Sequence, residues 1–176
     1  MPRIPYKTDA EAGPPELVAA IRKRRGGRLG ALDRILLYSP PFAAGWNELL
    51  GRVRSDLAVP MPLRELVMCA VAVLNGADYE LHHHGPIFLA QGGTAAQLDA
   101  LNALPAIDAT LFDSAQRAAL QLALEMTRQV RVADATFDAA RRALGSDRHL
   151  FELIGVIAAY NMVSRILVAV GVEATD

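Results

Sequence analysis

The short segment NGADYELHHHGP, residues 75–86, holds the side chains of this chain that are best suited to proton transfer. Successive residues of a helix point about 100° apart, so the adjacent His82, His83 and His84 cannot all face one metal ion. Helical spacing instead brings Glu80 and His84 together at i,i+4. An imidazole that titrates near neutrality and is oriented by a carboxylate is suited to acid–base chemistry. The segment therefore predicts an acid–base pair.

A bound metal is a weaker interpretation of the same residues. Glu80 and His83 form one ExxH unit, whereas di-iron helical bundles use two such units and two further carboxylates. The sequence contains no second ExxH. We therefore predict no bound metal. His82 is predicted to cover the surface, and His84, one turn inside the helix, to be functional.

Glu65 stands in the most apolar helical segment of the chain, residues 62–76, with Cys69 one turn later. A buried carboxylate costs free energy unless it is paired or protonated. Two interpretations remain open: Glu65 is a second acid–base group, or it forms a structural ion pair with an arginine such as Arg165. Neighbouring Arg64 is expected to point to solvent. Cys69 is predicted to be a core thiol.

Proline and glycine punctuate the chain at intervals typical of short helices. Asp78 and Thr94 are predicted N-caps, and the helix over residues 114–130 is predicted to start at Asp113 or Ser114. Trp46, Tyr160 and Met162 are predicted to line the core or a pocket. No convincing pair of strands is present. The predicted helices are 15–25, 32–39, 41–57, 62–76, 79–91, 94–104, 114–130, 134–145 and 146–170. We therefore expect an all-α, single-domain helical bundle of about eight helices over residues 15–176, preceded by an N-terminal arm over residues 1–14.

Composition narrows the class of protein. Hydrophobic residues make up 52% of the chain and charged residues 21%, with a formal net charge of −1. This balance gives no excess of positive charge with which to bind nucleic acid or an anionic membrane surface. The only basic run, residues 22–25, is expected to be a solvated helix end. One cysteine excludes an intramolecular disulfide and is compatible with a cytoplasmic location, which we predict.

Two segments bear on targeting. The first 17 residues lack the apolar core of a signal peptide. The apolar stretch 151–172 is interrupted by Glu152, Asn161 and Arg165. It is expected to be a buried helix of a soluble bundle, so no membrane partner is predicted.

Two stretches of sequence resemble a known family. Residues 64–84 follow the pattern R-E-L-x-M-C-A-V-A-x-L-N-G-A-x-Y-E-L-x-H-H, and residues 160–172 read Y-N-M-V-S-R-I-L-V-A-V-G-V. The chain from about Leu32 onward resembles the carboxymuconolactone decarboxylase and alkyl-hydroperoxidase D-like superfamily. The resemblance implies an all-helical fold that assembles as a homotrimer or homohexamer. The apolar segments 62–74 and 150–170 suit such an assembly.

The peroxidase members of that family carry a glutamate, a CxxC pair and a histidine. Glu65 matches the glutamate and His84 the histidine, whereas Ala77 and Glu80 stand where the two cysteines would be. Peroxide reduction of that kind needs a thiolate and a resolving thiol. The chain therefore resembles a member of the family that lacks the CxxC pair.

What remains resembles the decarboxylase side of the family. The resemblance implies a cofactor-free acid–base lyase or isomerase that acts on a small lactone or carboxylic acid, as in aromatic-compound degradation. His84 would be the proton shuttle, Glu80 would orient it, and Glu65 would lie across the pocket as a second acid–base group. Tyr79 or His83 would donate a hydrogen bond to the substrate. The alternatives are a peroxiredoxin-type antioxidant protein and a non-catalytic, oligomeric ligand-binding member of the family.

Overall fold

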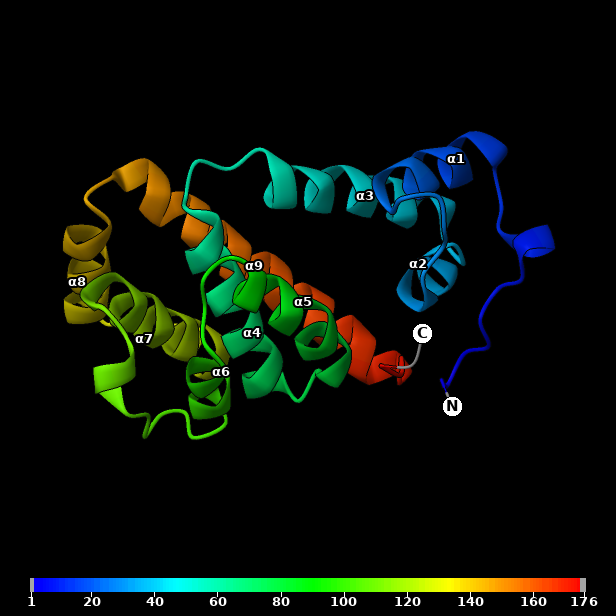
Figure 1. The fold of residues 1–176 in the computed structure, drawn as a ribbon. Coiled ribbons are helices and arrows are strands. Elements are labelled where there is room, and N and C mark those ends of the chain that lie inside the picture. The colour runs from blue at the N-terminus through cyan, green and yellow to red at the C-terminus, as the bar shows by residue number, and fades with distance from the viewer. Residues whose placement is uncertain (1, 175–176) are drawn as a thin grey trace. The chain divides into compact units, whose positions relative to one another are not determined.

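The computed structural model describes residues 2–174, which contain nine α-helices, two short 3-10 helices and no strand (Figure 1). The predicted all-α class is confirmed, with nine helices where about eight were expected. The elements in chain order are η1 (Asp9–Glu11), α1 (Pro15–Arg24), α2 (Ala31–Leu36), α3 (Pro40–Ser55), α4 (Met61–Asn75), α5 (Asp78–Ala90), α6 (Ala95–Leu101), η2 (Ala109–Leu111), α7 (Ser114–Arg128), α8 (Asp134–Leu144) and α9 (Asp147–Val170).

Local chemistry sets the helix ends. Gly76 and Gly145 end α4 and α8 in the left-handed conformation, with φ of 65° and 64°, which glycine adopts without steric cost. The predicted N-cap at Thr94 is confirmed, and of the two residues expected to start α7, Asp113 rather than Ser114 is the cap. Each of these side chains accepts a hydrogen bond from the backbone N–H three residues later. The predicted cap at Asp78 is wrong. Asp78 is the first residue of α5, where its carboxylate lies near the positive end of the helix dipole.

The described chain forms two compact units, one from residues 2–57 with 169–174 and one from residues 58–168. The predicted arm and domain also include Met1 and residues 175–176, which lie outside the described residues. The first unit contains α1, α2 and α3, and the second contains α4 to α8 and most of α9.

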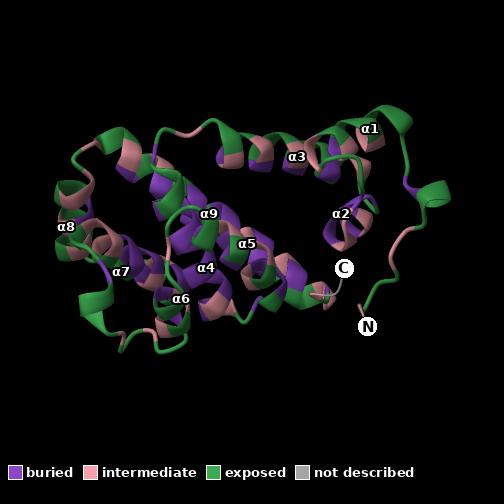
Figure 2. Ribbon diagram, in the orientation of Figure 1, coloured by how far each residue is buried: buried purple, intermediate pink, exposed green. Residues whose placement is uncertain are grey.

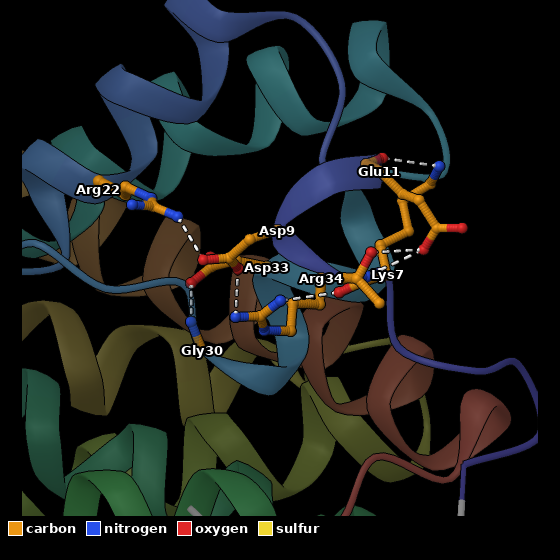
Figure 3. A network of polar contacts seen from close by, with 8 residues as sticks. Lys7, Asp9, Glu11, Arg22, Gly30, Asp33 and Arg34 are labelled. Atoms are coloured by element: carbon orange, nitrogen blue, oxygen red, sulfur yellow. Dashed lines mark hydrogen bonds and ion pairs between the residues drawn. The ribbon is translucent and has the colours of Figure 1, made fainter.

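Ion pairs hold the N-terminal segment within the first unit. Arg34 donates to the Asp9 carboxylate at 2.7 Å and to the Lys7 carbonyl at 2.8 Å, and Arg22 pairs with Asp9 at 2.9 Å (Figure 3). The basic run on α1 is therefore not simply a solvated helix end. Its arginines are matched by acidic side chains of the same unit, including the buried Asp33, whose carboxylate lies 3.2 Å from Arg25.

Helix α4 is the core of the second unit. Eleven of its fifteen residues are buried (Figure 2), and it packs against α5, α6 and α7. Its all-round apolar character is therefore explained by burial within the chain. The expectation that Arg64 points to solvent is wrong, because only 6% of this residue is exposed.

Helix α9 is, among the described residues, the one helix long and apolar enough to cross a membrane by length and composition. Half of its most apolar stretch is buried within the chain, as in the core helix of a globular protein. Its contribution to the second unit is a set of inward-facing residues that includes Leu153, Tyr160 and Asn161.

The end of α5 packs closely against the turn that follows it. The Phe88 ring is fully buried and occupies the space in which a Cβ atom on Gly93 would stand. Phe88 lies one turn beyond His84, so this contact fixes the end of the helix that carries the histidine. Glycine is required at position 93 by a close approach rather than by its backbone angles.

We predict that Gly93→Ala lowers the free energy of unfolding by about 1–3 kcal/mol, because the added methyl group must displace a buried ring. Gly155→Ala is the matched control, since Gly155 is exposed within α9 and nothing lies near its added Cβ. That change should stabilise the protein by about 0.5–1 kcal/mol. Urea denaturation of both variants measures the two effects, and equal effects would contradict the packing described.

Candidate active site

His84 of α5 is the centre of a buried polar cluster. Its Nδ1 lies 2.6 Å from Glu65 Oε2 on α4, and its Nε2 lies 3.3 Å from Glu80 Oε2 one turn earlier on α5. The Tyr160 hydroxyl of α9 lies 3.1 Å from the same Nε2. All four side chains are at least nine-tenths buried, with residue exposures between 2% and 5%. Three helices therefore bring two carboxylates and a phenol to one imidazole.

The two ends of the imidazole have different partners. A carboxylate accepts hydrogen bonds, so Nδ1 is the donor to Glu65, and this bond orients the ring. Nε2 faces both Glu80 and Tyr160, whose ring meets the imidazole edge-on at 86°. Glu80 occupies the first turn of α5, one helical turn before His84. Nε2 is therefore the end of the ring at which a proton can be exchanged.

Electrostatics favour a charged imidazole at this site. Burial lowers the pKa of His84, but the hydrogen bonds and charges of Glu65 and Glu80 outweigh it, so the pKa is raised above its ordinary value of 6.5. A raised pKa stabilises the imidazolium, the form that can donate a proton at neutral pH.

The structure brings together three of the predicted site residues, Glu65, Glu80 and His84. Glu65 was expected to lie across the pocket from His84. It instead contacts the ring directly and forms the shorter of the two carboxylate contacts to it. The alternative ion pair between Glu65 and Arg165 is not formed. Arg165 instead donates to Asn161, at 2.6 Å to its side-chain oxygen and 3.1 Å to its carbonyl.

Tyr79 and His83, the other two predicted site residues, contact each other. Their rings stack at 4.2 Å and 26°, and His83 Nδ1 donates to the Tyr79 carbonyl at 2.8 Å. Tyr79 is buried, His83 is half-buried and His82 is exposed. The surface position predicted for His82 is confirmed, and of the three adjacent histidines only His84 is buried.

Tyr160 is the site residue that the sequence did not reveal. It was predicted to line the core or a pocket, but its hydroxyl contacts the histidine. The two residues are 76 positions apart, so no local spacing could pair them. The only signal was the position of Tyr160 at the start of the Y-N-M-V-S-R stretch.

Cys69 is a core thiol, as predicted. It is fully buried, and burial, together with the charges of Glu65 and Glu80, raises the pKa of its thiol to about 12. The thiolate is the nucleophilic form of cysteine, so this residue is unreactive at neutral pH. Within residues 2–174, no group of three or more His, Cys, Asp or Glu side chains is arranged to hold a metal ion.

Comparison with known proteins gives one family and a consistent fold. Residues 40–125 match the sequence profile of the Carboxymuconolactone decarboxylase family. This range includes Glu65, Glu80 and His84 but ends before Tyr160. None of the curated protein sequences compared with the chain matches it.

Several crystal structures resemble nearly the whole chain, and three of them illustrate the likeness. One is an alkylhydroperoxidase AhpD core, an uncharacterized peroxidase-related protein from Ralstonia eutropha JMP134, with a TM-score of 0.83, 20% identity, and coverage of 99% of this chain and 93% of that one. An uncharacterized peroxidase-related protein from Silicibacter sp. TM1040 has a TM-score of 0.78, 18% identity, and coverage of 98% and 93%. The debrominase Bmp8, in a cysteine-to-alanine variant bound to 2,3,4-tribromopyrrole, has a TM-score of 0.78, 19% identity, and coverage of 97% and 90%. At these identities the likeness establishes the fold.

The raised pKa of His84 makes stability depend on pH. The unfolded chain releases this proton near the ordinary value, whereas the folded protein keeps it to higher pH. The contribution of the pair is therefore complete below the unfolded pKa and is lost as pH rises through the folded pKa, at about 1.4 kcal/mol per pH unit. We predict that the free energy of unfolding falls from neutral to alkaline pH more steeply in the wild type than in His84→Gln. Urea titrations across that range measure it, and parallel pH profiles would contradict the assignment.

We predict that Cys69 does not react with thiol reagents or form a sulfenic acid with peroxide while the protein is folded. In denaturant the same reagent should label one thiol per chain. Reagent kinetics with and without urea provide the comparison. Labelling of the folded protein at the denatured rate would show that the thiol is accessible and would restore a peroxidase mechanism.

Proposed function

From the premise that this chain belongs to the carboxymuconolactone decarboxylase family, we propose that it is a cofactor-free acid–base enzyme. The proposed reaction is decarboxylation or isomerisation of a small lactone or carboxylic acid. The observation that carries the proposal is the buried His84 imidazole, bound by Glu65 at one nitrogen and by Glu80 and Tyr160 at the other.

Each side chain has a definite part in the proposed chemistry. Glu65 holds the ring through Nδ1 and stabilises its positive charge. His84 Nε2 is the group that gives and takes the proton. Glu80 and Tyr160 both lie within reach of that nitrogen, so either can hold or relay the proton between turnovers. In this scheme Glu65 orients the ring, and Glu80 works at the reactive nitrogen.

In decarboxylation, the bond between the carboxylate carbon and the neighbouring carbon breaks and releases CO2. The electron pair passes into an adjacent carbonyl or alkene of the substrate. The imidazolium then protonates the carbon, and the neutral ring recovers a proton from water. The Tyr160 hydroxyl can donate to the oxygen that gains negative charge. In isomerisation the same nitrogen removes one proton and returns it at another carbon, so no net proton is consumed.

Burial of the cluster sets a condition on the reaction. Because all four side chains are at least nine-tenths buried, a substrate can reach Nε2 only when the neighbouring side chains move. When the side chains close again over the substrate, they exclude bulk water from the site. This strengthens the electrostatic interactions around the imidazole.

A peroxidase function has less support. The peroxidase-related names belong to structures that share the fold at 18–20% identity. Ala77 and Glu80 occupy the positions of the family's cysteine pair, and the single thiol of the chain is buried and protonated. The proposal therefore assigns the site to acid–base chemistry.

We predict that His84→Gln lowers kcat by about 10²- to 10⁴-fold, the usual contribution of a general acid–base group. Turnover of a panel of small lactones and β-keto acids by the wild type identifies the substrate for this comparison. His82→Gln is the matched control, because it makes the same change at the adjacent, exposed imidazole and should leave kcat unchanged. Equal turnover by His84→Gln and the wild type would remove His84 from the mechanism.

A further inference from the structure

Asn161, the residue after Tyr160 on α9, is the centre of a second buried polar cluster. Its side-chain oxygen accepts hydrogen bonds from Asn75, the last residue of α4, at 3.1 Å and from Arg165 at 2.6 Å. Its side-chain nitrogen donates to the Thr127 hydroxyl of α7 at 2.9 Å and to the Ile157 carbonyl at 3.0 Å. Both donor hydrogens and both acceptor lone pairs of the amide are therefore used.

The Asn161 side-chain amide connects three helices of the second unit. The bond from Asn75 joins α9 to α4, the helix that carries Glu65, and the bond to Thr127 joins α9 to α7. Hydrogen bonds are directional, whereas apolar contacts between smooth helix faces allow a helix to turn or slide. The amide cluster therefore fixes the rotation and the axial position of α9 against α4 and α7.

Fixing α9 at Asn161 also fixes Tyr160. Adjacent residues of a helix hold a constant angle of about 100° between their side chains. A turn of α9 about its axis would therefore move the Tyr160 hydroxyl away from Nε2 of His84, to which it lies at 3.1 Å. The histidine is on α5 and Glu65 is on α4, so the phenol depends on a constraint between helices rather than on local spacing.

We propose that Asn161 is a positioning residue of the active site, which holds the Tyr160 hydroxyl against His84 Nε2 by clamping α9 to α4 and α7. The claim that this positioning matters for catalysis rests on the proposed function. The contact that it explains is a geometric feature of the folded chain, and it can be measured without a substrate.

The test is the titration of the His84 imidazole, which is monitored by ¹⁵N NMR in the folded protein. The His84 signal is assigned by its loss in His84→Gln. Tyr160→Phe removes the hydroxyl, and the change that it causes in the His84 titration midpoint is the reference for the other variants. Asn161→Ala should move the midpoint in the same direction, by about 0.5 pH unit, the equivalent of a hydrogen bond of ordinary net strength. In the double variant, Asn161→Ala combined with Tyr160→Phe should shift the His84 midpoint no further than Tyr160→Phe alone.

Leu153→Ala is the control for a purely structural effect. Leu153 is fully buried on α9, about two turns before Tyr160, so its truncation lowers stability without touching the amide cluster. It should leave the His84 midpoint unchanged. If Asn161→Ala does not fold, Thr127→Val replaces it, because this change removes one hydrogen bond at nearly constant volume and should give a smaller shift of the same sign.

Three results would overturn the proposal. The His84 midpoint could be unchanged in the Asn161 and Thr127 variants. Asn161→Ala could shift the midpoint equally with and without the Tyr160 hydroxyl, or Leu153→Ala could shift it as much as Asn161→Ala does. Absence of lyase turnover in the wild type would reject the proposed function and leave these titrations unaffected. The two claims therefore fail separately.

Discussion

The hydrogen bond between Glu65 and His84 is the interaction on which the rest of the site depends. A carboxylate and an imidazole inside the most apolar part of the chain each pay a large desolvation cost when alone. At 2.6 Å each supplies the partner that the other needs. The pair fixes the ring, raises the pKa of His84 and leaves the second nitrogen facing Glu80 and Tyr160. Loss of either side chain would leave the other as a buried polar group without this hydrogen-bond partner.

The identity of residue 80 directs this cluster toward proton chemistry. The resemblance places Glu80 and Ala77 at positions that hold cysteines in peroxidase members of the family. A carboxylate one turn before His84 adds negative charge beside the ring, where a thiol would supply a nucleophile. The glutamate and histidine of the family pattern remain in place, so the same fold can hold a proton relay without sulfur.

Local sequence features predicted most of the fold, because helix ends follow local rules. Proline at the starts, glycine at the ends and the caps at Thr94 and Asp113 set boundaries that the structure confirms within a few residues. Asp78 was misplaced by one position, since a carboxylate serves both as a cap and as a first-turn residue. Arg64 was placed outside because a charged residue is rarely buried.

The candidate site could be predicted only where helical spacing applies. Glu80 and His84 are one turn apart, so their meeting followed from the sequence. For Glu65 the sequence left two roles open, a second acid–base group or an ion pair with Arg165, and it did not predict the direct bond to His84. Tyr160 required the packing of α9, which depends on contacts between segments far apart in the chain. Its neighbour Asn161, taken in the sequence only as a polar interruption of an apolar stretch, makes those contacts.

The titration and the ring protons of His84 test the central claim most directly. In ¹H–¹⁵N spectra of the folded wild type, the ring should lose its second proton at a higher pH than an ordinary histidine, and the Nδ1 proton should resonate far downfield because it lies in a short bond to Glu65. Glu65→Gln should remove that downfield signal. A ring that titrates at or below the ordinary pKa, or an Nδ1 proton insensitive to the Glu65 substitution, would contradict the account.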